Sequence, residues 1–191
     1  LATLRYVMSL RERYEVHMLC GNCDNLTFHF VDQTPDIPPE FYDSYVFGWG
    51  EKCVLTQMAR EAGVPLESPA DFPNLRAVIR ERFAPELAFL RALPTILLSE
   101  RFLFVHGGGY REDRLEQLTA WRGMKNDNFL SLGLSFHRWV VVGHWPVTLY
   151  DPSIPSAAPI ILPERHIISI DGGCQLKWDG QLNALIIPDG E

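Results

Sequence analysis

The order in which helix and strand patterns occur is the strongest constraint on how this chain folds. Apolar residues at helical spacing begin at Leu4, and the stretches 41–61, 74–83 and 85–92 also favour helix. Short apolar runs that are typical of strands dominate after Pro94. Helices that come early and strands that come late predict an α/β fold, in the form of a layered α/β sandwich with a mixed sheet.

Short apolar runs mark the predicted strands, and several end in residues that are typical of sites. The first run leads into residues 21–25, where Gly, Asn and Asp predict a polar loop. The polar pair Ser99 and Glu100 separates two runs and indicates a hairpin. The predicted strands are residues 16–20, 95–98, 101–105, 139–142, 166–170 and 182–187.

Length and composition bound the class of protein. At roughly 150 residues per domain, 191 residues predict one domain over residues 1–191. Hydrophobic residues make up 47% and charged residues 21%, which excludes a disordered or low-complexity chain. The net charge of −7 argues against nonspecific binding to a nucleic-acid backbone. No apolar run approaches the ~20 residues of a membrane helix, so we expect no membrane partner.

Cysteine usage favours a reducing compartment. The four cysteines are too few and too irregularly spaced for a secreted disulfide scaffold, so we expect a cytoplasmic protein. Cys20 and Cys23 form a C-x-x-C pair that would fit a redox site, but a buried, structural Cys20 is the favoured interpretation because no second pair exists. The sequence opens at Leu1 without an initiator Met, and we therefore expect an upstream segment.

Three uncharged donors follow predicted strands and are candidate metal ligands. Asn22 follows the run 16–20, whereas His106 and His144 each end a strand beside a glycine. Loops at strand ends can bring such residues together at one edge of a sheet. An amide oxygen with two imidazoles suits Mn, Fe or Zn better than Ca or Mg. Neutral ligands leave the ion's charge uncompensated, so carboxylates are expected from elsewhere. Each histidine alone would also fit a structural core residue.

Four motifs in order resemble those of a known family. Residues 21–24 (Gly-Asn-Cys-Asp) look like G-N-H-[DE], and residues 104–108 (Phe-Val-His-Gly-Gly) look like F-V-H-[AG]-G. Residues 142–146 (Val-Gly-His-Trp-Pro) are similar to V-G-H-x-P, and residues 168–174 (Ile-Ser-Ile-Asp-Gly-Gly-Cys) to I-S-I-D-T-G-C. Over nearly its whole length the chain resembles the calcineurin-like metallophosphoesterases, in the branch of the protein serine/threonine phosphatases and the bacterial diadenosine tetraphosphatases.

The resemblance implies a site for two divalent ions, Mn, Fe or Zn. Asn22, His106 and His144 would bind the second ion together with a bridging Asp, and the ions would activate a hydroxide for attack on phosphorus. The family carries that Asp and the ligands of the first ion in two earlier motifs, G-D-x-H-G and G-D-x-x-D-R-G. These motifs would lie before Leu1, so the resemblance implies the C-terminal majority of a layered α/β/β/α sandwich with mixed sheets, and an incomplete metal site.

The resemblance also implies catalytic roles for Cys23, Asp24 and Arg122. Cys23 stands where the family has the general-acid His, and loss of such a group costs ~10²- to 10⁴-fold in rate. That loss predicts reduced hydrolysis of phosphoserine and better hydrolysis of anhydrides and diesters, whose leaving groups need less protonation. His29 is a conceivable substitute acid, although a surface role is favoured. Arg122 matches a phosphate-binding Arg and also fits an ordinary ion-paired surface residue.

Two functional hypotheses follow from these residues. The leading one is a metal-dependent phosphoesterase that hydrolyses phosphate esters or anhydrides in a phosphorylated small molecule, a nucleotide or a phosphopeptide. The alternative is a catalytically inactive phosphoesterase fold that serves as a protein-interaction module, which the Cys at position 23 keeps open. A redox role for the C-x-x-C pair is a more distant hypothesis.

Overall fold

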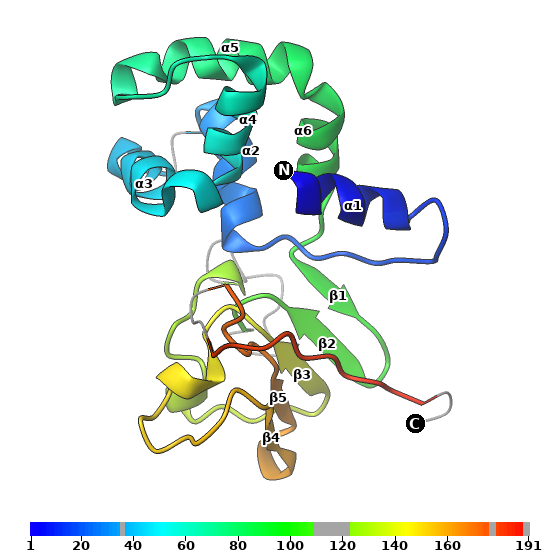
Figure 1. Ribbon diagram of the computed structural model, residues 1–191. Helices are drawn as coiled ribbons and strands as arrows, with labels where there is room; N and C mark the ends of the chain where they lie inside the picture. The colour runs from blue at the N-terminus through cyan, green and yellow to red at the C-terminus, as the bar shows by residue number, and fades with distance from the viewer. Residues whose placement is uncertain (35–36, 109–122, 176–178, 189–191) are drawn as a thin grey trace. The chain divides into compact units, whose positions relative to one another are not determined.

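The computed structural model describes residues 1–34, 37–108, 123–175 and 179–188. The chain divides into two compact units, which we call the helical unit (Leu1–Met18 and Cys23–Leu93) and the sheet unit (Leu19–Asn22 and Pro94–Glu191). Figure 1 shows helices α1 to α6 in the first and strands β1 to β5 in the second. The predicted α/β class is therefore confirmed. The prediction of a single domain stays a prediction.

The helical unit contains the helices that the apolar spacing predicted, and one further helix over residues 22–32 that it did not predict. The first helix ends at Leu10, earlier than the apolar pattern reaching Tyr14 indicated, and Tyr14 is exposed. The α-helices are α1 (Ala2–Leu10), α2 (Asn22–Asp32), α3 (Pro39–Asp43), α4 (Val54–Ala62), α5 (Phe72–Arg82) and α6 (Ala84–Arg91). Shorter helical turns are η1 (Ser44–Gly48), η2 (Gly50–Lys52) and η3 (Pro69–Asp71).

Aromatic packing joins α2 to α5 in the core of the helical unit. The buried rings of Phe30 and Phe72 meet edge to face, with centroids 5.0 Å apart. The guanidinium of Arg76 lies 4.5 Å from the Phe30 centroid, and its Nε donates to the Phe30 carbonyl at 2.7 Å. Arg76 thus satisfies a backbone acceptor near the C-terminal end of α2 while its charge rests on an aromatic face.

The sheet unit is built on a mixed sheet in the order β1-β2-β3-β5-β4. The central strands β2, β3 and β5 run parallel, whereas β1 and β4 pair antiparallel at the edges. The predicted hairpin and the predicted strands at 139–142 and 166–170 are confirmed. The strands are β1 (Ile96–Leu98), β2 (Phe102–Val105), β3 (Trp139–Val142), β4 (Ile160–Leu162) and β5 (Ile167–Ser169), and the short turns are η5 (Leu130–Leu132), η6 (Val147–Leu149) and η7 (Pro163–Arg165).

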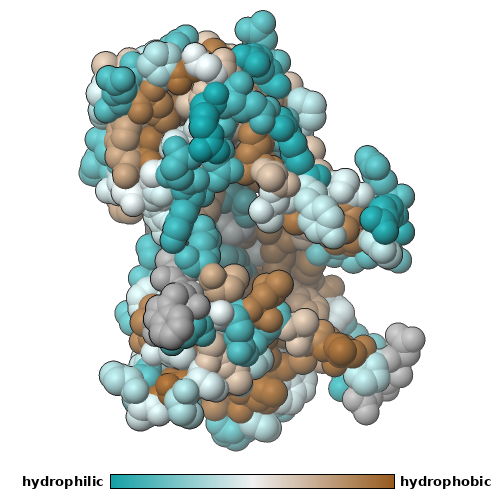
Figure 2. Space-filling view, viewed as in Figure 1, coloured by the Kyte–Doolittle hydropathy of each residue, from teal (hydrophilic) through white to brown (hydrophobic). Residues whose placement is uncertain are grey.

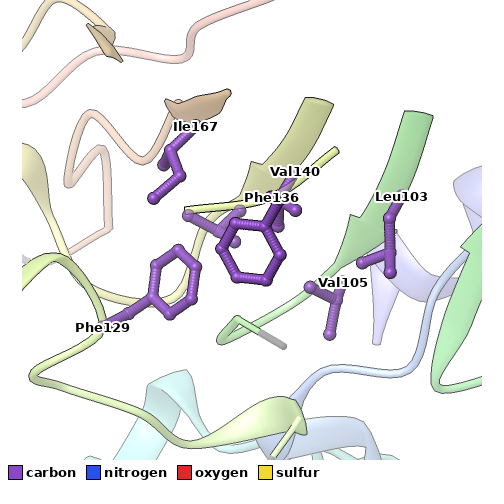
Figure 3. Packing of buried hydrophobic residues seen from close by; sticks show 7 residues of the cluster. Leu103, Val105, Phe129, Phe136, Val140 and Ile167 are labelled. Atoms are coloured by element: carbon purple, nitrogen blue, oxygen red, sulfur yellow. The ribbon is translucent and has the colours of Figure 1, made fainter. Parts of the chain in front are cut away.

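One face of this sheet is covered by two phenylalanines from the connection between β2 and β3. Figure 3 shows the rings of Phe129 and Phe136 lying among apolar side chains of the three parallel strands. Phe129 has no exposed surface, and the two ring centroids are 6.0 Å apart. The cluster consists of Leu103, Val105, Phe129, Phe136, Val140, Val142 and Ile167. Its burial fixes the strand ends from which the candidate ligands project.

Two predicted strands are wrong. Residues 16–20 form no ladder; the Cys20 amide donates to the Pro94 carbonyl at 2.9 Å, and Pro94 has no N–H with which to return a bond. Residues 182–187 also form no ladder within the described parts of the chain, and Leu182 and Ile186 are each 87% exposed. Figure 2 shows apolar residues, coloured brown, on the surface of the molecule. Strand propensity alone does not make a strand without a neighbour to pair with. The sequence patterns missed the edge strand β4.

The predicted polar loop at residues 21–25 is also wrong. Asn22 instead begins α2, and Asp24 lies in the first turn of that helix. A carboxylate in the first turn interacts favourably with the exposed N–H groups and the helix dipole, which explains why these turn-forming residues start a helix.

Among the described residues, none of the helices has the length and apolar character needed to cross a bilayer.

The Phe129 ring is predicted to be a major source of stability. Replacing Phe129 with Ala leaves a cavity beneath the sheet and should lower the free energy of unfolding by about 3–5 kcal/mol. Chemical denaturation of the protein, monitored by near-ultraviolet circular dichroism, measures this loss. Leu182→Ala is the matched control and should change stability by less than ~0.5 kcal/mol because its side chain is exposed. A loss below ~1 kcal/mol for Phe129→Ala would contradict the packing described.

Candidate functional site

Parallel pairing of β2 with β3 brings the two motif histidines together. Val105 and Val142 are register partners at the ends of these strands, and the Gly143 amide donates to the His106 carbonyl at 2.9 Å. The rings of His106 and His144 lie with centroids 5.2 Å apart and planes tilted by 60°. The carboxyl ends of parallel strands meet at one edge of a sheet, so this edge of the sheet unit is the candidate site.

Asn22 joins the histidines from a distant part of the sequence. It belongs to the sheet unit, and its Oδ1 lies 3.0 Å from Nε2 of His106. Because an amide oxygen only accepts, the hydrogen bond places the imidazole proton on Nε2. The structure therefore brings together all three predicted metal ligands, Asn22, His106 and His144.

The environment of His106 keeps its ring uncharged. Burial, and to a smaller extent electrostatic repulsion from His144, lowers the pKa of His106 to about 4. The ring is therefore neutral near pH 7, and a neutral imidazole is the form that can bind a metal ion.

His144 lies in a strained backbone conformation. Its φ is +66°, and the Trp145 amide donates to the Gly143 carbonyl at 2.8 Å, which makes His144 the central residue of a γ-turn. This turn form is rare and strained, at a cost of ~1–3 kcal/mol for a residue with a side chain. His166 also has a positive φ, but its Nδ1 donates to the Phe136 carbonyl at 2.8 Å and so closes a structural turn. This turn presents the largely buried His144 ring at the site edge.

The three uncharged donors suit a borderline divalent ion in their chemistry, because an amide oxygen and two imidazoles are ligands for Mn, Fe or Zn. Since Nε2 of His106 donates to Asn22 Oδ1, the lone pair of the neutral His106 ring is on Nδ1. Within the described residues, no three His, Cys, Asp or Glu side chains cluster in a way that could hold a metal ion. The donors therefore fit one ion only as a partial, neutral set to which carboxylates must be added.

Asp127 is a site residue that the sequence did not reveal. Its Oδ1 lies 2.8 Å from Nε2 of His144, and Lys125 Nζ donates to both carboxylate oxygens at 2.8 and 3.0 Å. Partial burial acts to raise the pKa of Asp127, but the hydrogen bonds from Lys125 and His144 outweigh it and lower the pKa. The only sequence signal was a polar run between apolar residues, which ordinarily indicates a turn.

The structure says less about the three predicted catalytic residues than about the candidate ligands. Cys23 and Asp24 follow Asn22 on α2 and belong to the helical unit, where the Cys23 carbonyl accepts from Thr27 Oγ1 at 2.8 Å and from Tyr45 Oη at 3.1 Å. Arg122 lies outside the described residues. The site geometry therefore comes from the three candidate metal ligands.

The glycines after His106 have a packing role. A Cβ on Gly107 would lie 2.7 Å from the backbone carbonyl of Met124. A Cβ on Gly108 would lie 2.4 Å from the Phe129 ring, and Gly108 has a φ of +113°. The sequence interpretation that these glycines let a phosphate approach stays a prediction, since close packing within the sheet unit already requires them.

The other interpretations made from single residues have plain structural counterparts. His29 bonds to Thr34 Oγ1 through Nδ1 at 2.6 Å within the helical unit. Asp171 accepts from the Gly173 amide at 2.8 Å, which confirms its role in a turn. Cys20 is buried as expected, and none of the four cysteines forms a disulfide.

Comparison of the chain with protein-family models, with curated proteins and with solved structures found no match. The resemblance to metallophosphoesterases thus depends on the four short motifs and stays a prediction. What the structure adds is that residues from three of those motifs, Asn22, His106 and His144, lie together at one sheet edge.

The close approach at Gly107 generates a prediction about stability. Gly107→Ala forces a Cβ against the Met124 backbone, so we expect a loss of ~1–3 kcal/mol in the free energy of unfolding. Gly48→Ala is the matched control: a Cβ there meets nothing within 4 Å, and the change should be neutral or slightly stabilising. Urea denaturation of both variants measures the difference. Equal stabilities for the two variants would show that the segments do not pack as described.

Proposed function

We propose that the chain functions as a metal-dependent phosphoesterase that hydrolyses phosphate esters or anhydrides. The observation that carries the proposal is the 3.0 Å approach of Asn22 Oδ1 to His106 Nε2, with the His144 ring beside them. Three motif residues from widely separated parts of the sequence converge at a strand-end edge, where α/β sheets commonly bind ligands. The finer fold, a layered metallophosphoesterase-like sandwich, is part of the same proposal.

Asn22, His106 and His144 would hold one ion of a pair, of the Mn, Fe or Zn class. When bound, such a pair supplies Lewis acidity toward the phosphoryl oxygens and an activated water. The role of this chain's own residues is to present uncharged donors: burial keeps the His106 ring neutral, and the γ-turn holds His144 toward the same edge. The carboxylates that the family carries in two earlier motifs are not among these 191 residues.

Cys23 is the residue that sets the proposed substrate class. A thiol at the position of the family's general acid cannot do the work of an imidazolium at neutral pH, because its pKa is ordinarily ~8.5. Poor leaving groups such as a serine alkoxide need that proton most. We therefore propose a preference for nucleotide anhydrides and aryl or nucleotide phosphodiesters over phosphoserine.

The ligand assignment predicts loss of both metal binding and hydrolysis. In the protein expressed from its complete reading frame, His106→Ala and His144→Ala should each weaken Mn²⁺ binding by more than the ~10- to 100-fold that loss of an outer-shell partner costs. Isothermal titration with Mn²⁺ and hydrolysis of an aryl phosphodiester measure the two effects. His17→Ala is the control, because its side chain is 68% exposed.

The outcome that would overturn the enzyme proposal is equally concrete. With Mn²⁺ present, absence of hydrolysis of aryl phosphates, phosphodiesters, diadenosine polyphosphates and phosphopeptides alike would refute it. Such a result would favour the alternative, an inactive phosphoesterase fold that serves as an interaction module.

Restoring the family's acid should change the substrate preference. Cys23→His is expected to raise hydrolysis of a phosphoserine peptide by at least about 10²-fold, and to change hydrolysis of an aryl phosphodiester much less. Cys23→Ser is the matched control, since it changes the same position without adding an imidazole. Steady-state kcat on both substrates is the measurement. If the unmodified protein hydrolyses a phosphoserine peptide as fast as an aryl phosphodiester, the leaving-group argument fails.

A further inference from the structure

The segment that carries Asp127 is anchored at both ends. Met124 and Phe129 flank it and are 1% and 0% exposed. The Gly107 amide donates to the Gly123 carbonyl at 2.6 Å, which ties the segment to the residue after His106. The position of Asp127 is therefore set by core packing and by the strand end, unlike that of a charge on a loose surface loop.

The hydrogen bond from His144 to Asp127 determines which ring nitrogen carries the proton. A carboxylate only accepts, so the 2.8 Å contact of Asp127 Oδ1 with His144 Nε2 places the proton on Nε2. In the neutral ring the lone pair is then on Nδ1. The side chain of His144 is only 9% exposed, so water competes little for this hydrogen bond.

Lys125 keeps the carboxylate in the form and orientation that this role needs. Its Nζ donates to both oxygens, at 2.8 and 3.0 Å. Lys125, Asp127 and His144 thus form a chain of charge-assisted hydrogen bonds that ends at the imidazole.

We propose that Asp127 is a positioning residue for His144: its carboxylate holds the Nε2–H tautomer and leaves Nδ1 of the anchored ring as the atom that binds a divalent cation. This inference rests on the proposed function. It follows the general arrangement in which a carboxylate accepts from the far nitrogen of a metal-binding histidine and fixes its orientation. The γ-turn sets the backbone conformation of His144, and Asp127 holds the Nε2 end of its ring.

The tautomer can be read without any metal. In protein from the complete reading frame, with ¹⁵N in its histidine rings, long-range ¹H–¹⁵N correlation spectra distinguish the two neutral tautomers of His144. At pH values where the same spectra show the ring to be neutral, we expect the Nε2–H tautomer alone. In Asp127→Asn the amide can donate as well as accept, and the Nδ1–H tautomer should appear.

Metal affinity supplies the second readout. Asp127→Asn should weaken Mn²⁺ binding by ~10- to 100-fold in isothermal titration. Asp151→Asn is the matched control, because it makes the same change of charge in the sheet unit at a carboxylate that accepts from the Ser153 amide at 2.7 Å. The control should leave both the His144 tautomer and the Mn²⁺ affinity unchanged. Thermal melts of both variants identify any loss of folding.

The two readouts separate failure of this inference from failure of the proposed function. An Nδ1–H tautomer in the unmodified protein, or equal Mn²⁺ affinities in a folded Asp127→Asn variant, would overturn the positioning role while leaving the phosphoesterase proposal intact. Absence of Mn²⁺ binding in the unmodified protein would overturn the metal-ligand role together with the proposed function.

Discussion

In-register parallel pairing of β2 with β3 is the interaction on which the candidate site depends. The pairing aligns Val105 with Val142, so the residues that follow these strands meet at one edge. Burial of Phe129 and Phe136 against the paired strands stabilises that alignment, and a slip of one residue would turn the apolar side chains of the core to the opposite face. The distance between His106 and His144 is thus set by the hydrophobic core and not by any attraction between the two rings.

Local sequence patterns predicted the elements whose backbone hydrogen bonds join residues that are close in the sequence. The helices other than α2, and the 95–105 hairpin, follow from spacing and turn residues, because their backbone hydrogen bonds are local. The failures at 16–20 and 182–187 share a cause: both are apolar runs with strand-like composition, and a strand requires a partner that composition does not specify. The missed edge strand β4 is the converse, a three-residue segment whose pairing with β5 makes it a strand.

The candidate site was predictable to the extent that it follows strand ends. The glycine-flanked histidines could be identified because each follows an apolar run, and Asn22 was found by its place in a motif. No such sequence feature identified Asp127. It lies in a connection whose course depends on the burial of Met124 and Phe129, so its 2.8 Å contact with His144 is a product of tertiary packing. Sequence patterns identify the residues at the ends of strands and helices. They rarely identify which residue of a long connection will contact them.

Under the proposed function, charge balance explains why these donors alone would be an incomplete metal site. A divalent ion beside His106 and His144 would bring two positive charges into a partly buried edge, where an uncompensated charge is costly. The amide of Asn22 and the neutral ring of His106 offset none of that charge. Asp127 is a carboxylate in contact with His144, but Lys125 already balances its charge at 2.8 Å. Tight binding therefore demands additional carboxylates, and the histidines can orient an ion that acidic groups must first make stable there.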